Sequence, residues 1–463
     1  MSKTIIDTST SRRSITARPL RRAPGTRLTE SSLLLTIVGV FAVVTLVWAN
    51  SGGWHEIQRG WPHAWRSLAS LSGIWTSLAG MIGLVLAARL VSVERAIGLD
   101  RMLTWHRIAG DTMGLVLGVH IVTGVMAEMP MRGGLVNTIL DLTGRTPYMA
   151  LTFVGSLIVG IVVVSSLKSV RQQLAYETWY FVHLTAYLGL ALSFSHQITL
   201  GTVLANVAVV RWAWVLMSVS VFLFVIIGRW SDVVRSVRRP LKVLEVNRET
   251  DDAVSIVLGG PNLTRMTGEG GQFVSLRMLV KGQWWKTNPY SLSAAPTTAG
   301  MRITIRDRGD ASSAVATLRK GDRVAVEGPY GLMTPDLFEG AQPLFIAGGV
   351  GVTPVCAMLQ ALPFGSRPIV LLRGANVKEI PHYAEIRELT EQRGGQVMTL
   401  LGRTAAMKSK DPFAPQTLRR AVPTLDRCVA FVCGPTSLTF AARKGLRDAG
   451  LPSARIHLER PWW

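Results

Sequence analysis

Six long stretches in the first half of the chain contain almost no charge, and they constrain its fold more than any other feature. Residues 31–50, 67–88, 146–167, 178–210 and 212–228 contain no Asp, Glu, Lys or Arg, and 108–127 contains only Asp111. A helix requires about 20 mostly apolar residues to cross a bilayer. Because 178–210 is too long for one span and Gly201 suggests a turn, we expect six spans, at 31–50, 67–88, 105–127, 147–168, 177–198 and 203–228.

The chain is basic but sparsely charged. It carries a formal net charge of +21, yet only 17% of its 463 residues are charged and 48% are hydrophobic. This composition argues against a nucleic-acid partner and against disorder, and it indicates a protein in contact with a lipid bilayer. Because Lys and Arg gather on the cytoplasmic side, the loop charges predict a multi-pass cell-membrane protein with both termini in the cytoplasm; these charges are Arg12, Arg13, Arg89, Arg95, Arg101, Lys168, Arg171, Arg229 and Arg235.

Near residue 233 the long apolar stretches give way to a different sequence pattern. Short alternating segments at 242–248, 253–258, 272–278, 301–306 and 323–327 predict a small antiparallel β-barrel. Beyond 341, strand-like and helix-like runs alternate, which is typical of an α/β dinucleotide-binding domain. We therefore expect a multi-domain membrane protein with four parts: a basic cytoplasmic tail at 1–30, a six-helix transmembrane domain at 31–232, a β-barrel at 233–340 and an α/β nucleotide-binding domain at 341–463.

Four of the eight histidines lie in the expected spans, two on the third and two on the fifth. His106 and His120 are 14 residues apart, and His183 and His196 are 13 residues apart. At 1.5 Å per residue, each spacing corresponds to roughly 20 Å along a helix. Since both helices run from the cytoplasm to the exterior, the four imidazoles form an inner and an outer pair. Two such layers would hold two haems stacked across the membrane.

The helical phase supports this pairing only in part. A spacing of 14 places His120 within about 40° of His106, whereas a spacing of 13 places His196 roughly 140° from His183. The fifth span therefore requires either a local bulge or haems held at different azimuths.

Two charged residues near these sites have open roles. Asp111 either forms an i,i+4 pair with Arg107 or takes part in a proton relay. Arg211, near the outer end of the sixth span, either extends to the membrane interface or neutralises a propionate of the outer haem.

The histidine spacings resemble those of the NADPH oxidase and ferric reductase superfamily. The run 99–107, LDRMLTWHR, also resembles that family's start of the third helix. The resemblance implies that His106 and His183 bind the iron of an inner b-type haem. It implies that His120 and His196 bind the iron of an outer one.

A second resemblance lies in the expected barrel. The motif Asn288-Pro289-Tyr290-Ser291, after Gly271-Gln272-Phe273, resembles the FAD-binding barrel of the ferredoxin-NADP reductase superfamily. The resemblance implies that Tyr290 stacks on the flavin and that Ser291 hydrogen-bonds near its reactive ring nitrogen. It also brings three more residues to the cofactor, namely Gln272, Asn288 and Pro289.

The family usually has a basic residue where this chain has Asn288. Asn can donate a hydrogen bond to the FAD pyrophosphate but supplies no charge, so we expect Lys286 or Arg306 to replace it. Arg306, Gly309 and Asp310 also match the family's phosphate-contacting strand and turn.

The expected strand 343–347 leads into a glycine-rich loop, AGGVGVTP, at 347–354. Glycines let the backbone approach a pyrophosphate, and a helix N-terminus favours its negative charge. The loop resembles the GG-x-G-x-TP loop of the reductase superfamily. The resemblance implies that NAD(P)H binds at Gly348, Gly349, Gly351, Thr353 and Pro354.

Further residues resemble the nicotinamide side of the same family. The motif Cys433-Gly434-Pro435 implies a thiol beside the nicotinamide, although a buried packing cysteine is the simpler interpretation. Arg403 implies a grip on the 2′-phosphate, which favours NADPH over NADH. Trp463 or Trp462 is expected to lie over the flavin and to move aside for hydride transfer.

These motifs predict an NAD(P)H oxidase or ferric reductase-type oxidoreductase, which we expect to be bacterial. Electrons would pass from cytoplasmic NADPH through FAD and two bis-histidine haems to a small-molecule acceptor outside. The favoured acceptor is O2, giving superoxide; the alternatives are a ferric chelate, a partner protein or quinone. Oxidases of the family often carry another histidine one turn beyond the outer ligand of the third helix, where this chain has Gly124.

Overall fold

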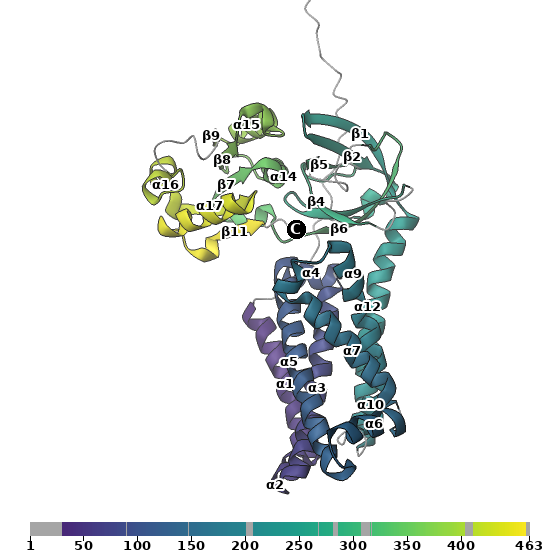
Figure 1. Cartoon of the computed structure of the whole chain (residues 1–463). Helices are drawn as coiled ribbons and strands as arrows, with labels where there is room; N and C mark the ends of the chain where they lie inside the picture. Colours follow the sequence, from purple (N-terminus) through teal and green to yellow (C-terminus); the bar gives the residue numbers. More distant parts are fainter. Residues whose placement is uncertain are drawn as a thin grey trace, which may run out of the picture. The chain divides into compact units, whose positions relative to one another are not determined.

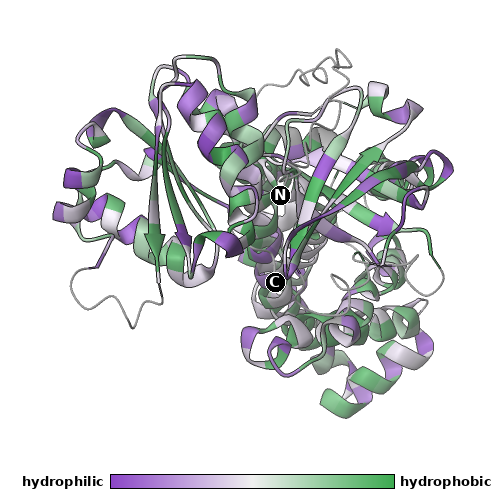
Figure 2. Ribbon diagram, turned by 90° about the horizontal axis from the view of Figure 1, so that it is seen from above, coloured by the Kyte–Doolittle hydropathy of each residue, from purple (hydrophilic) through white to green (hydrophobic). Residues whose placement is uncertain are grey.

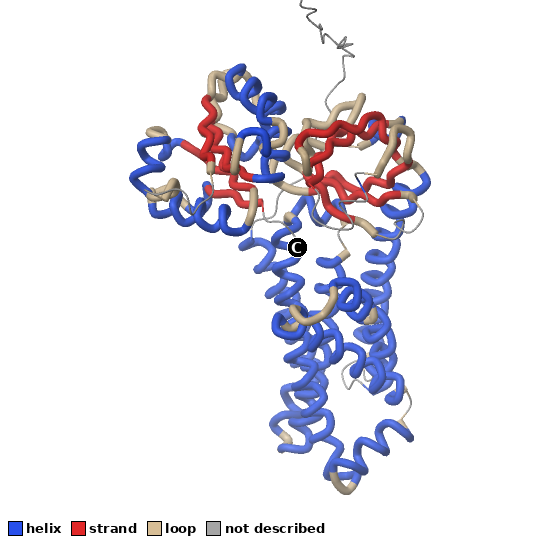
Figure 3. Tube along the Cα trace, turned by 45° about the horizontal axis from the view of Figure 1, so that its top comes forward, coloured by secondary structure: helices blue, strands red, loops and turns tan. Residues whose placement is uncertain are grey.

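The computed structural model describes residues 30–88, 90–146, 148–200, 207–266, 268–280, 286–306, 315, 317–402 and 411–459. The chain forms two compact units that divide between Ser231 and Asp232 (Figure 1). Within the described residues, the first unit is helical and the second contains the strands (Figure 3). The expected tail, 1–30, lies almost entirely outside the described residues.

Five helices of the described chain are long and apolar enough to cross a membrane. They are α1 (Glu30–Trp48), α3 (Trp61–Ala87), α5 (Leu99–Arg132), α7 (Met149–Ser166) and α12 (Ala208–Arg238). The span containing α1 continues through η1 (Ala49–Gly53) and α2 (Trp54–Gln58). Large apolar side chains such as Leu35, Leu115 and Leu216 are about 70% exposed, as expected for helices whose outer faces contact lipid.

The expected fifth span is divided into two helices, α9 (Tyr176–Leu184) and α10 (Ala186–Leu200). They meet at Thr185, whose backbone N–H and Oγ1 both donate to the carbonyl of Val182, at 3.1 Å and 2.7 Å. The break therefore falls between His183 and His196. It supplies the local irregularity that their 13-residue spacing requires. Shorter helices, α4 (Val91–Ile97), α6 (Leu135–Arg145) and α8 (Lys168–Arg171), connect the long ones.

Small residues let the membrane helices approach one another closely, as is typical of helix packing in lipid. A Cβ built on Gly155 of α7 would lie 2.7 Å from the carbonyl oxygen of Gly189 on α10. A Cβ built on Gly189 would in turn lie 3.0 Å from the carbonyl oxygen of Gly155. These two helices therefore touch through their backbones.

The second unit begins with an antiparallel sheet, which we name the antiparallel lobe. Its six strands lie in the order β4-β3-β6-β1-β2-β5. A bridge between Leu292, just after β4, and Ile303 of β5 links the two opposite edges of the sheet. Ile256, Leu276 and Ile303, from three different strands, are fully or almost fully buried in the core of this lobe. The strands are β1 (Leu241–Thr250), β2 (Ala253–Gly259), β3 (Phe273–Met278), β4 (Asn288–Ser291), β5 (Met301–Arg306) and β6 (Arg323–Tyr330).

The remainder of this unit is a parallel sheet with helices on both faces, the parallel lobe (Figure 2). Its strand order is β11-β10-β7-β8-β9. The cluster with Phe345 packs under α14 (Val352–Ala361) and α15 (Tyr383–Gln392), and that with Leu344 packs under α16 (Pro415–Ala421) and α17 (Thr436–Asp448). The strands are β7 (Gln342–Gly348), β8 (Ile369–Gly374), β9 (Gln396–Leu401), β10 (Cys428–Cys433) and β11 (Ile456–Glu459).

We expect Gly155→Val to destabilise the helical unit by roughly 1–3 kcal/mol, because its Cβ would collide with Ser193 Oγ at 2.5 Å and α7 would have to separate from α10. Gly160→Val is the matched control on the same helix, since nothing lies within 4 Å of its Cβ. Thermal unfolding of both variants in detergent measures the difference. Equal unfolding temperatures would contradict the close contact.

Candidate functional site

The four membrane histidines form two pairs, as their depths predict. The ring centres of His106 on α5 and His183 on α9 are 5.8 Å apart, and those of His120 on α5 and His196 on α10 are 5.9 Å apart. A metal ion lies about 2 Å from an imidazole nitrogen that binds it. One ion between two such rings therefore places the ring centres roughly 6 Å apart, so both pairs have the spacing of axial ligands.

Hydrogen bonds fix the orientation of three of these rings. The Nδ1 atoms of His106, His120 and His196 lie 3.0, 2.8 and 2.5 Å from backbone carbonyl oxygens of Gly83, Ala69 and Ser193, respectively. A carbonyl oxygen only accepts, so Nδ1 carries the proton and Nε2 keeps the lone pair that binds a metal. Such outer hydrogen bonds orient ligating histidines in metal sites.

Helix α3 provides the space as well as the acceptors for the histidines of α5. A Cβ on Gly73 would lie 2.8 Å from Cε1 of His120, and a Cβ on Gly83 would lie 3.8 Å from Nδ1 of His106. Any larger residue at position 73 would displace the imidazole. The sequence analysis did not identify this glycine.

His183 has a different environment. Its Nδ1 lies 3.2 Å from the hydroxyl of Ser166, which also accepts a hydrogen bond from Nε1 of Trp179 at 3.4 Å. The Trp179 ring stacks on the His183 ring with centres 5.0 Å apart, and Arg171 lies 4.5 Å from the centre of a Trp179 ring. Trp179 belongs to no motif of the sequence, but its i,i+4 spacing from His183 is a signal of contact on a helix.

Each pair offers two imidazoles. Among the described residues, no group of three or more His, Cys, Asp or Glu is arranged to hold a metal ion. Two axial imidazoles suit a porphyrin, because the macrocycle supplies the other four ligands.

In the second unit, the predicted flavin motif forms β4 at one edge of the antiparallel lobe. Asn288, Pro289 and Tyr290 pair with β3, and all three are partly buried. Burial raises the pKa of Tyr290 to about 12, so its ring is a neutral phenol suited to stacking. Gln272 donates to the carbonyl of Gly331 at 2.9 Å and thereby holds the loop beside this motif.

Ser291 connects the flavin motif to the parallel lobe. Its Oγ donates to Oε1 of Glu459 at 3.0 Å, and Glu459 pairs with Cys433 across β10 and β11. Burial and the Glu459 carboxylate both raise the pKa of Cys433, so its side chain is a protonated thiol. The structure thus brings together Ser291 and Cys433, which the sequence predicted separately. Glu459 was missed because no motif marks it in the sequence.

The glycine loop and the Cys433 motif meet at the carboxyl ends of β7 and β10. These strands are neighbours, with Ala347 opposite Cys433, and the strand order reverses between them. Ligands of open α/β sheets bind at such a reversal. A Cβ on Gly351 would lie 2.4 Å from the carbonyl oxygen of Cys433, and Gly349 has a φ of +59°. Both positions therefore favour glycine.

The loop ends at a helix N-terminus. Thr353 and Pro354 lie in the first turn of α14, and Thr353 Oγ1 donates to the Val350 carbonyl at 2.8 Å. Gly434 has a φ of +151°, and Pro435 precedes the first turn of α17. Two helix N-termini therefore open toward the same edge of the sheet, where their exposed amides can receive phosphate oxygens.

Arg306 lies beside this loop, at the end of β5. Its Nη1 would be 3.5 Å from a Cβ built on Gly349. Its Nε donates to Oδ2 of Asp252. Partial burial raises the pKa of Asp252, but hydrogen bonds from Arg306 and Thr250 outweigh it and lower the pKa below its ordinary value.

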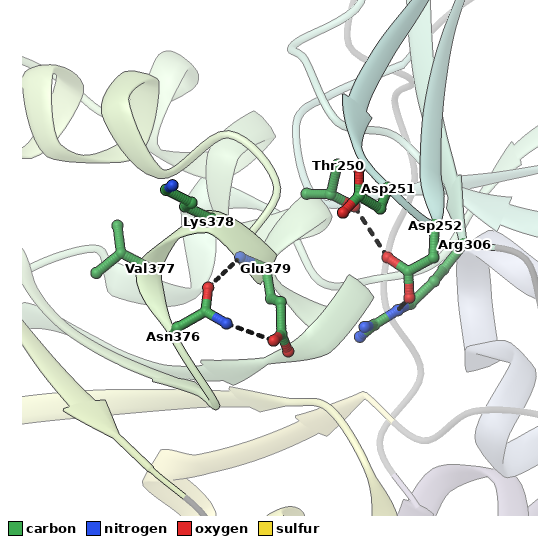
Figure 4. A pocket seen from close by; sticks show the side chains of 8 residues that line it. All are labelled: Thr250, Asp251, Asp252, Arg306, Asn376, Val377, Lys378 and Glu379. Atoms are coloured by element: carbon green, nitrogen blue, oxygen red, sulfur yellow. Dashed lines mark hydrogen bonds and ion pairs between the residues drawn. The ribbon is translucent and has the colours of Figure 1, made fainter.

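A cavity of about 740 Å³ lies next to Arg306, between the β1–β2 turn and the segment after β8. Figure 4 shows Asn376 and Glu379 on one side and Asp252 and Arg306 on the other, with Lys378 nearby. Its lining contains two cations and three carboxylates, and one of the cations, Arg306, is paired with Asp252. The lining residues are Thr250, Asp251, Asp252, Arg306, Asn376, Val377, Lys378 and Glu379.

Several expected site residues lie outside the described residues. They are Gly309, Asp310, Arg403, Trp462 and Trp463. Their roles in binding phosphate, selecting NADPH and covering the flavin remain predictions.

Two protein-family models match the chain. The ferric reductase like transmembrane component matches residues 72–194, and the oxidoreductase NAD-binding domain matches residues 345–444. The first match contains His106, His120 and His183 and ends two residues before His196. The second contains the glycine loop and the Cys433 motif.

Sequence relatives of the chain are reductases. The chain is 30% identical over 230 residues to the ferredoxin reductase component of 3-ketosteroid-9-alpha-monooxygenase from Mycolicibacterium smegmatis, covering 47% of this chain and 64% of that protein. It is 30% identical over 210 residues to ferredoxin–NADP reductase B from Sorangium cellulosum, covering 42% of this chain and 84% of that protein. The chain thus spans less than two thirds of the first of these relatives.

Among solved structures, the chain is similar to the FAD/NAD-binding domain of nitric oxide dioxygenase from Vibrio cholerae. The identity is 22% and the TM-score is 0.39, over 48% of this chain and 97% of that one. A TM-score below 0.5 gives this likeness no weight as evidence of function.

We expect Glu459→Gln to make Cys433 more reactive toward iodoacetamide at pH 8. The Glu459 carboxylate disfavours the thiolate, so its removal lowers the pKa of Cys433 and raises the fraction of the reactive form. Peptide mass spectrometry of the folded protein measures the rate at each cysteine. Cys428, whose pKa burial raises to about 11, is the internal control. An unchanged Cys433 rate would contradict the contact.

Proposed function

Because the chain belongs to the NADPH oxidase and ferric reductase superfamily, we propose that it transfers electrons from NADPH, through FAD and two b-type haems, to an acceptor across the membrane. It is a multi-pass membrane oxidoreductase that depends on NAD(P)H. The observation that carries the proposal is the two imidazole pairs, with ring centres 5.8 and 5.9 Å apart, at two levels of α5.

The four histidines hold the haems in this proposal. Haem supplies one-electron redox chemistry at a depth where no protein side chain does. His106 and His183 form the inner axial pair, and His120 and His196 form the outer one. With both imidazoles of each pair engaged by its haem, the acceptor would be reduced without binding to the metal.

The parallel lobe binds NADPH at the edge where β7 and β10 end. The amides at the start of α14 receive its phosphates, and Arg306, at the end of β5, is left for the pyrophosphate of FAD. The nicotinamide lies near Cys433, and the flavin lies near Tyr290. Ser291 and Glu459 form a hydrogen-bonded pair that can carry a proton away from the reaction.

The finer architecture is part of the proposal. The broken pair α9 and α10 together makes one crossing, the fifth along the chain, and brings the total to six. The bridge between Leu292 and Ile303 closes the antiparallel lobe as a barrel. An even number of crossings leaves both termini on one side. Basic residues such as Lys168, Arg171 and Arg238 favour the cytoplasm for that side.

Oxygen is the acceptor that we propose, with superoxide as the product. Each NADPH supplies two electrons, so two O2 molecules are reduced per NADPH. A ferric chelate is the second candidate. Two features favour the ferric chelate. Gly124 stands where many oxidases have a histidine. Charged side chains also lie at the outer end of the helices, where Arg66 and Arg132 both contact Glu128.

We expect the purified wild type to contain two low-spin haems per chain and His120→Ala to contain one, because the outer pair loses a ligand. Visible spectra and haem quantitation measure the change. His63→Ala is the matched control, since His63 lies outside the pairs and contacts Glu56 at 2.8 Å. A wild-type protein without haem would overturn the proposal.

We expect superoxide dismutase to inhibit NADPH-driven cytochrome c reduction by the wild type, because superoxide carries the electrons from the enzyme to cytochrome c. The same assay without oxygen should be slow. Insensitivity to the dismutase, together with rapid reduction of ferric citrate, would contradict oxygen as the acceptor and support a ferric chelate.

A further inference from the structure

The two lobes of the reductase unit meet through a partly buried group of polar side chains, which we name the interlobe cluster. It contains Arg302 and Thr304 from β5, Gln360 from α14, and His382 and Glu385 at the start of α15. Neither the flavin motif nor the glycine loop includes any of these residues. Buried polar groups of this kind are costly unless each finds a partner with good geometry.

His382 is the centre of the cluster. It is 8% exposed and has a φ of +58°, which is unusual for a residue with a side chain. Its Nε2 lies 2.8 Å from Oγ1 of Thr304, across the lobe boundary. Its Nδ1 lies 3.4 Å from a carboxylate oxygen of Glu249 on β1 and 3.4 Å from one of Glu385. One imidazole therefore contacts both lobes.

Glu385 makes the second connection. Arg302 Nη2 lies 2.9 and 3.1 Å from its two carboxylate oxygens, and Gln360 donates to one of them at 2.7 Å. Burial raises the pKa of Glu385, but His382 and Arg302 outweigh burial and lower it to about 2. The carboxylate is therefore ionised at neutral pH. Removing its charge would leave Arg302 without its anionic partner.

The cluster is attached to the elements that carry the chemistry. Gln360 lies on α14, the helix that starts at the glycine loop, and its Oε1 accepts from the backbone N–H of Ala295 at 2.8 Å. Thr304 and Arg302 lie on β5, which ends at Arg306 and is bridged to Leu292 beside Ser291. The interlobe cluster thus fixes the glycine loop relative to the flavin motif.

We propose that His382 and Glu385 are positioning residues that set the distance between the nicotinamide and the flavin. The inference rests on the proposed function of this unit. Hydride transfer requires reacting atoms in close contact, and a displacement of about 1 Å lowers its rate on the order of 100-fold. Nucleotide affinity depends on the phosphate contacts of the parallel lobe alone, so it is insensitive to the cluster.

The test is anaerobic stopped-flow reduction of the bound flavin by NADPH in the full-length protein. We expect Glu385→Gln to lower the limiting rate by about 10- to 100-fold and to weaken the nicotinamide–flavin charge-transfer absorbance. The NADPH dissociation constant should stay within about threefold of wild type. The matched control is Glu391→Gln on the same helix, whose carboxylate contacts Arg387 and is 60% exposed.

A readout without nucleotide completes the test. Hydrogen exchange in β5 and α15 should be faster in Glu385→Gln than in wild type and unchanged in Glu391→Gln. If Glu385→Gln does not retain flavin, His382→Gln is judged by the same criteria. A limiting rate and exchange equal to wild type would overturn the inference. A wild-type flavin that NADPH does not reduce would instead overturn the proposed function, and the inference with it.

Discussion

The helical unit depends on the distance between α3 and α5. Backbone carbonyls of Ala69 and Gly83 on α3 accept from Nδ1 of His120 and His106, and this leaves Nε2 of each ring free of the proton. Helix α3 can come this close because Gly73 has no side chain to meet the His120 ring. The orientation of the His106 and His120 rings therefore follows from hydrogen bonds between side chains of α5 and backbone carbonyls of α3.

In the reductase unit, too, contacts between segments that are distant in sequence set the geometry of the site. The carboxyl ends of β7 and β10 are adjacent because the strand order reverses there, so two loops that are distant in sequence form one edge. Ser291 then reaches this edge from the other lobe by its hydrogen bond to Glu459. This hydrogen bond requires the two lobes to keep their relative position. In our proposal, His382 and Glu385 hold the lobes in that position.

The sequence predicts features that follow a local period and misses those that depend on the tertiary fold. The depths of the four histidines follow from helical rise, and the meeting of the glycine loop with Cys433 follows from strand alternation. The sequence does not predict α16 and β11, because both are too short to show a clear period. Glu459 lies 168 residues from Ser291, and no local pattern reports such a contact.

The claim that unites both units is electron transfer across a bilayer, and reconstituted vesicles test it most directly. Protein in liposomes receives NADPH from outside, while cytochrome c is enclosed in the lumen with oxygen present. The account predicts that the enclosed cytochrome c is reduced by wild type and not by His106→Ala, although NADPH still reduces the flavin of that variant. Reduction that occurs only when cytochrome c is on the same side of the bilayer as NADPH would contradict electron transfer across the membrane.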